Sequence, residues 1–310
     1  MVFSKKSKIL FIGAGKIAAS LIHHLLKSGY NVKGIISRTG KPASDYSLRF
    51  KLINHSNNFN SITSAYKIFF LTVPDDQIVK TAGKLSKLKL DFKNSLFIHV
   101  SGSENLSSLN SLKKKGAATA TFHIMQTFPS QKISKMSGSY SAVETTSREA
   151  ERFLRKIAVD LNVVSFSLNE GKKTAYHLAG VFAANFLTGN IFITKKIMEE
   201  AGIKSIASYD VMKPIIQSTL MNIQKLGPEE SLSGPINRGD VKTIKNHIKI
   251  LKIILQKNKN NNLGKILLAG YLIQSLNLLE IVLKKEKKPG INHLTIKHLL
   301  TKEINKIKFQ

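Results

Sequence analysis

The sequence predicts an α/β fold, in which an N-terminal domain built on a parallel sheet precedes an all-helical C-terminal domain. Three observations support this prediction. Short apolar runs alternate with helical patterns in the first half of the chain, a glycine-rich turn joins the first run to the first helix, and strand patterns stop beyond about Gly171. We place the boundary near Asn169, which divides the chain into residues 1–168 and 169–310.

The apolar runs are continuous rather than alternating and are bounded by Gly, Pro or Ser, which is typical of parallel strands covered on both faces. The predicted strands are Lys8–Ile12, Val32–Ile36, Ile68–Val73, Leu96–Val100, Ala117–Phe122, Tyr140–Val143 and Val163–Phe166. Helical periodicity between them predicts helices at Ile17–Leu26, Gln77–Leu85 and Arg148–Asp160.

Longer helical patterns fill the second half of the chain. They are Ala175–Glu200, Ser208–Lys225, Val241–Lys257 and Leu263–Lys284, interrupted by the loop Gly227–Asp240 and by an Asn- and Lys-rich turn at 256–262. The Lys-rich C-terminal end is predicted to fray.

Composition excludes several classes of site. The 310 residues include no cysteine, which excludes disulfide scaffolds, thiolate metal sites and a cysteine nucleophile. The histidines and acids lack metal-ligand spacing, so no metal is expected. No phosphate-binding Walker loop and no Gly-x-Ser-x-Gly turn of a hydrolase is present.

The chain is strongly basic, with 48 Lys and Arg against 19 Asp and Glu and a net charge of +29. The lysines are spread along the chain rather than gathered beside aromatic residues. An excess of Lys together with many Asn and Ile residues is typical of AT-rich coding sequence. We therefore do not expect nucleic acid as a partner.

Membrane and export signals are weak. The apolar run Ile9–Ile12 is too short for a signal peptide. The stretch 174–194 carries no charged residue and is long enough to span a membrane, but His177, Asn185 and Asn190 would be costly in lipid. It is predicted to be a buried helix, covered by the other domain or by a second subunit. We expect a cytoplasmic homodimer without a membrane partner.

The first strand leads into Gly13-Ala-Gly15-Lys16-Ile17-Ala18, a Gly-x-Gly-x-x-Ala turn that opens a helix. Gly13 permits the tight turn and Gly15 lets the backbone approach a pyrophosphate, while the helix N-terminus attracts the phosphates. This arrangement predicts a dinucleotide-binding domain of the Rossmann type, with Lys16 and Ile17 at the phosphates.

The end of the second strand predicts which dinucleotide binds. NAD proteins usually carry Asp or Glu there for the ribose 2′-hydroxyl, but this chain has Ser37-Arg38-Thr39 and no acid before Asp45. Arg38 can pair with a 2′-phosphate and Ser37 can add a hydroxyl donor, so NADP(H) is preferred. The alternative is a solvated loop arginine.

Two more strand ends should line the same cleft, because ligands of such sheets bind beyond the carboxyl ends of the strands. Val73 and Pro74 follow the third strand, on the adenosine side. Ser101 and Gly102 follow the fourth, where Gly102 would let the nicotinamide approach and Ser101 could bind the carboxamide or a substrate oxygen. A plain turn is the alternative for both.

Together these motifs resemble a family of Rossmann-like proteins whose C-terminal domain is the domain of unknown function 2520 (DUF2520). The matching segments are Gly13–Ala18, Leu71–Asp76, His99–Gly102, Phe122–Phe128, Tyr176–Asn185 and Ser233–Asp240. The family is similar in layout to ketopantoate reductase, pyrroline-5-carboxylate reductase and the 6-phosphogluconate dehydrogenase superfamily. The resemblance implies dimerisation through the uncharged helix and, as the preferred specific reading, ketopantoate reduction.

A reductase needs a proton donor and a clamp beside the reacting bond. Related reductases place Lys and Asn one turn apart on the first helix of the second domain; here Asn185 is preceded one turn earlier by Val181. His177 lies on the same broad face as Asn185, about 80° away in a regular helix. We predict His177 as general acid and Asn185 as substrate-orienting group. Burial in a helix interface is the alternative.

His123 follows the strand that ends at Phe122 and is the second candidate acid, the alternative being a loop histidine that caps backbone groups. In the loop Gly227–Asp240, Arg238 could clamp a substrate carboxylate, and Asp240 could hold Arg238 or cap the next helix.

These observations predict an NADPH-dependent oxidoreductase that reduces a small 2-oxo acid, ketopantoate being the preferred substrate. Reduction of a cyclic imine such as pyrroline-5-carboxylate is the alternative enzyme reaction. Because Val181 stands where related reductases keep a lysine, a non-catalytic NADP-binding sensor or scaffold is the third hypothesis.

Overall fold

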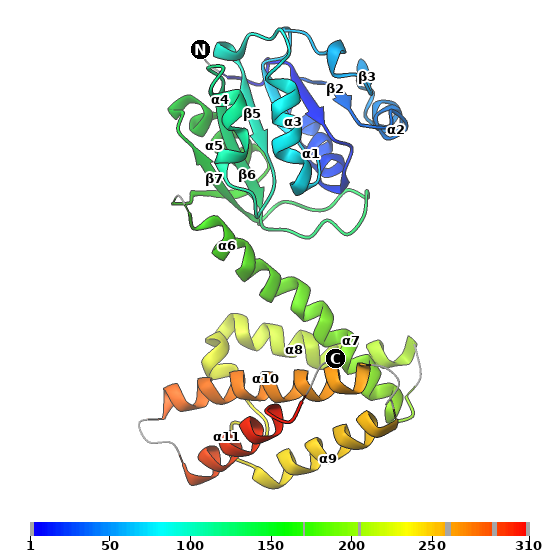
Figure 1. Cartoon of the computed structure of the whole chain (residues 1–310), viewed down its shortest axis with the longest axis vertical. Coiled ribbons are helices and arrows are strands. Elements are labelled where there is room, and N and C mark those ends of the chain that lie inside the picture. Colours follow the sequence, from blue (N-terminus) through cyan, green and yellow to red (C-terminus); the bar gives the residue numbers. More distant parts are fainter. Residues whose placement is uncertain (1–2, 170, 204–205, 258–261, 287–289, 308–310) are drawn as a thin grey trace. The chain divides into compact units, whose positions relative to one another are not determined.

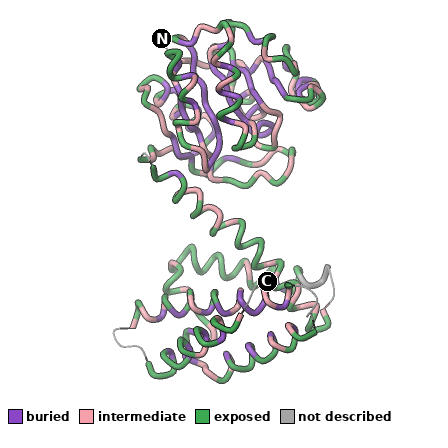
Figure 2. The backbone as a smooth tube through the Cα atoms, in the orientation of Figure 1, coloured by how far each residue is buried: buried purple, intermediate pink, exposed green. Residues whose placement is uncertain are grey.

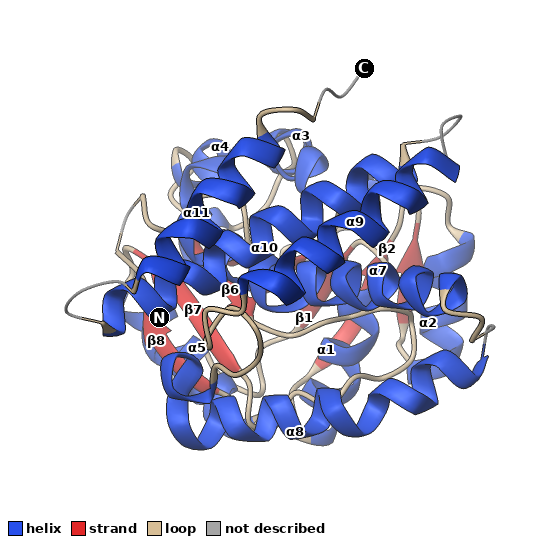
Figure 3. Cartoon of the chain, turned by 90° about the horizontal axis from the view of Figure 1, so that it is seen from below, coloured by secondary structure: helices blue, strands red, loops and turns tan. Residues whose placement is uncertain are grey.

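Two units make up the chain, Met1–Leu187 and Thr188–Gln310. The computed structural model describes residues 3–169, 171–203, 206–257, 262–286 and 290–307. Every strand among these residues lies in the first unit, and the second is built of helices (Figures 1 and 3). This confirms the predicted fold class. The predicted domain boundary near Asn169 stays a prediction, since the two units divide inside a long helical segment rather than before it.

One eight-stranded sheet has the order β3-β2-β1-β4-β5-β6-β7-β8. The strands are β1 (Ile9–Ile12), β2 (Val32–Ile36), β3 (Asn54–Ser56), β4 (Ile68–Leu71), β5 (Leu96–His99), β6 (Ala118–Ile124), β7 (Tyr140–Thr145) and β8 (Val164–Ser167). All neighbours are parallel except β6 and β7, which pair antiparallel, so the sheet is mostly parallel, as the predicted fold class requires. Strand β3 was not predicted, because its polar residues at the sheet edge form no apolar run.

Helices cover both faces of this sheet. They are α1 (Lys16–Lys27), α2 (Lys41–Phe50), α3 (Ile78–Leu85), α4 (Asn110–Lys113) and α5 (Arg148–Asp160), with short 3₁₀ turns η1 (Phe59–Ser61), η2 (Asp75–Gln77), η3 (Phe92–Asn94) and η4 (Leu106–Leu109). Alternate side chains of one strand point to opposite faces. On β4, Ile68 and Phe70 join the core with α1, α2 and α5, whereas Phe69 and Leu71 join the core with α3 and α4.

The face of the sheet that α3 and α4 cover becomes polar towards β6. On this strand Ala120, Phe122 and Ile124 enter the apolar core on the side of α1 and α5. The alternate residues Thr121 and His123 therefore point to the other side, where polar groups replace the apolar layer. The candidate site lies on this side.

A continuous helical segment leaves the first unit. It consists of α6 (Lys173–Gly180), a π-helical turn η5 (Val181–Asn185) and α7 (Phe186–Glu200). None of the described side chains at 174–194 is buried, as the green and pink tube in Figure 2 shows. Phe182 is 59% exposed and Phe192 is 54% exposed. Burial of this stretch by the other domain or by a second subunit stays a prediction.

The second unit has its own apolar core. After α7 come α8 (Ile206–Ser231), α9 (Val241–Lys257), α10 (Leu263–Lys285) and α11 (Ile291–Ile304). Side chains of α9, α10 and α11 form this core. The predicted fraying of the C-terminal end is wrong for α11, because its side chains Ile296 and Leu300 are fully buried.

Two described helices, Lys173–Glu200 and Leu263–Lys285, are long and apolar enough to cross a membrane by length and composition alone. A core helix of a water-soluble protein passes the same test, and the second of the two packs between α9 and α11. The predicted cytoplasmic location remains a prediction.

Candidate functional site

The turn between β1 and α1 exposes its backbone, as its glycines predicted. Gly13 has φ +107°, a conformation that side chains rarely adopt, and a Cβ there would lie 2.6 Å from the carbonyl carbon and oxygen of Thr72. Thr72 Oγ1 donates a hydrogen bond to the Gly13 carbonyl at 2.6 Å, and Tyr46 donates one to the Gly15 carbonyl at 2.9 Å. No side chain caps the N-terminus of α1 among the described residues, so its N–H groups are available to a phosphate.

A cleft of about 560 Å³ opens beside this turn. Its walls include Gly13, Ala14, Gly15, Ser37, Arg38, Thr39, Val73, Pro74, Lys80 and Lys84. Three of these side chains are cations, and none of the described residues that line the cleft is Asp or Glu. A dinucleotide with an additional 2′-phosphate suits such a cleft better than one that needs a carboxylate for its ribose.

The sequence analysis did not predict Lys80 and Lys84 as site residues. Both lie on α3 and line the cleft together with Arg38. Their spacing of four residues places them on one face of a helix and was a usable signal. Ser37 lies where it was predicted, but its Oγ accepts a hydrogen bond from Ala43 N–H at 3.1 Å. It therefore also fixes the start of α2, and only its hydroxyl proton is free to reach a ligand.

The turn after β5 combines a structural serine with a glycine at a close approach. Ser101 Oγ accepts hydrogen bonds from the backbone N–H groups of Ser103 and Glu104, at 3.1 and 3.0 Å. Ser101 therefore stabilises the turn, which agrees with the plain turn that the sequence analysis gave as the alternative. Its role towards substrate stays a prediction. A Cβ on Gly102 would lie 2.7 Å from His123 Nε2 and against His177 Nδ1. Only glycine lets the chain pass these two imidazoles.

The structure thus brings both candidate histidines to one place. Their ring centroids are 5.9 Å apart, and Tyr176 stacks edge-on to His123 at 5.6 Å. Burial and, after it, the nearby Lys173 cation lower the pKa of His123 to about 4. Burial also lowers the pKa of His99, on the neighbouring strand, to about 3. The rings of His123 and His99 are therefore neutral at neutral pH.

Asn185 was predicted to share a face with His177. The turn between them is π-helical, so the rotation per residue differs from that of the regular helix on which the prediction rested. Asn185 is exposed, and its role towards substrate stays a prediction.

Arg238 and Asp240 lie in the second unit. Asp240 accepts hydrogen bonds from the backbone N–H and the hydroxyl of Thr243, at 3.0 and 2.6 Å, and so caps α9. Capping of the next helix is one of the two roles that the sequence analysis gave for Asp240. Arg238 is exposed, and its part in substrate binding stays a prediction.

The largest omission of the sequence reasoning is Lys173. Its side chain is completely buried beside Glu144 of β7, with Nζ 3.4 Å from Oε2. Lys173 lies two turns before Val181, the position at which related reductases keep a lysine, and it is spaced one turn from His177. This spacing is visible in the sequence. The sequence analysis looked for a lysine one turn before Asn185, found Val181 there, and so did not consider Lys173.

Two families match parts of the chain. Residues 8–101 match the family described as NADP oxidoreductase coenzyme F420-dependent, and residues 139–266 match the domain of unknown function DUF2520. The resemblance stated from the sequence motifs is confirmed, and the first description agrees with the predicted cofactor.

Individual relatives are distant. A pyrroline-5-carboxylate reductase from Haemophilus influenzae is 24% identical over 223 residues, which are 71% of this chain and 78% of that protein. A structure from Bacteroides fragilis, provisionally assigned as an NADP oxidoreductase, has a TM-score of 0.72 and 21% identity over 88% of this chain and 98% of that one. A reductive aminase from Aspergillus terreus in complex with NADPH has a TM-score of 0.63 and 12% identity, covering 95% and 99% of the two chains. These structural likenesses show a shared fold.

Proposed function

We propose that this chain, which matches an NADP oxidoreductase family over residues 8–101 and DUF2520 over residues 139–266, reduces a C=N bond of a small imine with NADPH. The observation that carries the proposal is the packing of His123 and His177 against Gly102, in the turn that follows β5. Pyrroline-5-carboxylate reductase and imine reductases among the relatives support an imine over ketopantoate.

The cofactor half of the proposal follows from the cleft. The cleft that Gly13 and Gly15 line fits a pyrophosphate against the N-terminus of α1. Arg38 binds the 2′-phosphate, while Lys80 and Lys84 add positive charge. When bound, NADPH supplies a hydride to the substrate carbon.

The substrate half follows from the polar groups near Gly102. The neutral imidazole of His123 can accept or pass a proton without placing positive charge beside an iminium carbon. His123 Nε2 and His177 Nδ1 both face the glycine, so one ring can bind the substrate nitrogen while the other orients it.

A small 2-oxo acid such as ketopantoate is the second candidate. The buried Lys173 cation favours it, because positive charge near the reacting bond stabilises the alkoxide that carbonyl reduction forms.

The test is a substrate panel with purified protein, in which NADPH absorbance is followed. Cyclic imines with and without a carboxylate are compared with ketopantoate and other 2-oxo acids. The proposal expects the highest kcat/KM with an imine and NADPH. Higher kcat/KM for a 2-oxo acid selects the second candidate, and binding of NADPH without turnover of any compound selects the sensor hypothesis.

A further inference from the structure

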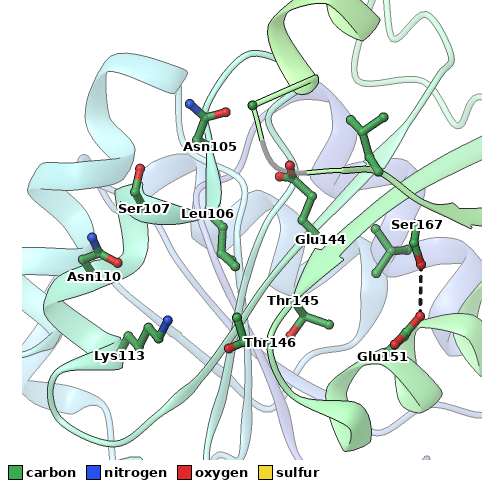
Figure 4. A pocket seen from close by; sticks show the side chains of 13 residues that line it. Asn105, Leu106, Ser107, Asn110, Lys113, Glu144, Thr145, Thr146, Glu151 and Ser167 are labelled. Carbon is green, nitrogen blue, oxygen red and sulfur yellow. Dashed lines mark hydrogen bonds between the residues drawn. The ribbon is translucent and has the colours of Figure 1, made fainter.

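A second cavity lies in the first unit, apart from the cofactor cleft. It has a volume of about 620 Å³ and lies between η4 and α4 on one side and the ends of β7 and β8 on the other (Figure 4). Among the described residues, none lines both this cavity and the cofactor cleft, and neither His123 nor His177 belongs to its walls. A molecule bound here is therefore distinct from the cofactor and from the compound that is reduced.

Most polar groups on the strand side of this cavity already have partners within the protein. Glu151 Oε1 accepts hydrogen bonds from Arg155 at 2.8 Å and from Ser167 Oγ at 3.0 Å. Thr145 Oγ1 donates a hydrogen bond to the Thr119 carbonyl at 2.8 Å. These contacts fix the wall in place, and they leave Glu151 and Thr145 with little capacity to bind a further molecule.

Glu144, on the same wall, is the exception. Its side chain lines the cavity and is only 9% exposed. Oε2 accepts a hydrogen bond from Thr121 Oγ1 at 3.3 Å and lies 3.4 Å from Lys173 Nζ, whereas good charge-assisted hydrogen bonds measure about 2.5–2.9 Å. No described residue donates a hydrogen bond to Oε1. A nearly buried carboxylate with so few donors is costly, so a donor group of a ligand in the cavity would stabilise it.

The lysine beside Glu144 leaves room for a second positive charge. Burial lowers the pKa of Lys173 to about 8, and the carboxylates of Glu144, Asp75 and Glu104 oppose that shift. Three carboxylates therefore act on one buried ammonium group, which leaves a net negative charge around it. The donor that meets Glu144 from the cavity is best a cation, because a charge-assisted hydrogen bond is stronger than a neutral one.

The opposite wall offers the complementary charge. Figure 4 shows Asn110 and Lys113 on the far side of the cavity from Glu144. Both side chains are exposed, and neither has a hydrogen-bond or ion-pair partner within the described part of the chain. An ammonium group beside an amide is a suitable pair of donors for a carboxylate. The two walls thus present an anion and a cation to the same space.

We propose that this cavity binds a free α-amino acid, whose ammonium group donates to Glu144 and whose carboxylate accepts from Lys113 and Asn110. Leu106 and Leu168 add apolar surface to the walls, which suits a short apolar side chain. The volume holds such a molecule together with water. No aromatic residue is among the described lining residues, so a sugar ring would find no surface to stack on. The inference goes beyond the proposed reductase activity and does not depend on it.

The first experiment identifies the ligand class. The whole chain is titrated calorimetrically with each standard L-amino acid, without cofactor. The one that binds best is then compared with the amine that lacks its carboxylate, with the acid that lacks its amino group, and with glycerol. The amino acid should bind at least about tenfold more tightly than either analogue, because each analogue loses one charge-assisted contact. Binding of no amino acid, or equal binding of an analogue or of glycerol, overturns the proposal.

The second experiment locates the site by reversing one charge. Lys113→Glu should weaken binding of the amino acid by about tenfold but should not weaken binding of the amine, which has no carboxylate to repel. Lys114→Glu is the matched control, because Lys114 is exposed on the same helix end and does not line the cavity. Glu144→Gln should weaken both ligands. An amino acid that binds Lys113→Glu with wild-type affinity lies elsewhere, and this overturns the proposal.

Two further measurements separate this site from folding and from the reductase. Lys113 is exposed, so Lys113→Glu should keep the wild-type melting temperature, and its result decides the question even if Glu144→Gln unfolds. Saturating NADPH should leave the Kd of the amino acid unchanged, since no described residue lines both cavities; displacement by NADPH overturns the proposal. The titrations need no turnover, so a chain that binds an amino acid but reduces no imine or oxo acid refutes the reductase alone.

Discussion

Arg38→Ala should weaken NADPH binding while leaving NADH binding unchanged. Arg38 lines the cofactor cleft at the end of β2, and its partner would be the 2′-phosphate that only NADPH carries. A charge-assisted hydrogen bond contributes about 1.5–3 kcal/mol, but the exposure of this side chain reduces that value. Since Lys80 and Lys84 remain, we expect a loss of about 1–2 kcal/mol, or about 5–30-fold in Kd.

Isothermal titration calorimetry with both cofactors measures this difference directly. Arg49→Ala is the matched control, because Arg49 is bound to the Gln131 carbonyl at 2.8 Å and does not line the cleft. An equal loss for NADPH and NADH, or no loss for either, would show that Arg38 does not read the 2′-phosphate and would remove the structural basis of the cofactor preference.

Four further outcomes are expected. Gly13→Ala should cost about 1–3 kcal/mol of unfolding free energy through backbone strain and should abolish NADPH binding, as measured by urea unfolding and calorimetry. Asp240→Ala should lower the melting temperature by uncapping α9 but leave the Kd for NADPH unchanged; a weakened Kd would instead place Asp240 at the ligand. His99 is held neutral in the folded state, with a pKa of about 3 against 6.5 when unfolded, so stability should be complete above pH 6.5 and decline as the pH falls below it. His99→Gln should flatten that decline in urea titrations, and an unaltered decline would exclude His99 as its source. Light scattering at micromolar concentration should give a dimer, because the stretch 174–194 is apolar and carries no charged residue, and a monomer would contradict this.

The sequence allowed prediction of those parts of the fold in which local pattern and tertiary structure agree. The core strands were recognisable because both faces are covered, which requires continuous apolar runs, and the Gly13 turn was recognisable because its φ needs glycine. Strand β3 and helix α11 were not predicted, because their local sequence patterns do not indicate the structure that they form. The first is a polar edge strand, and the buried residues of the second are spaced among lysines that resemble a solvated tail.

The candidate site was only partly predictable, because its residues meet through tertiary contacts. His123 and His177 were each recognisable from their positions, at a strand end and on the first helix of the second half. Nothing local to Glu144 distinguishes it from other acids, since its significance comes from the antiparallel pairing of β7 with β6, which sets it opposite Thr121. The burial of Lys173 likewise depends on how α6 packs beside β7.

Transfer of a labelled hydride tests the central claim most directly. NADPH carrying two deuterium atoms at C4 of the nicotinamide is mixed with the protein and the best imine of the panel, and the product is analysed by mass spectrometry. A reductase that binds its cofactor against the glycine turn and its substrate at His123 and His177 must place a single deuterium on the former imine carbon. A reduced product without deuterium, or no product while the labelled NADPH remains tightly bound, would contradict this account of the chain.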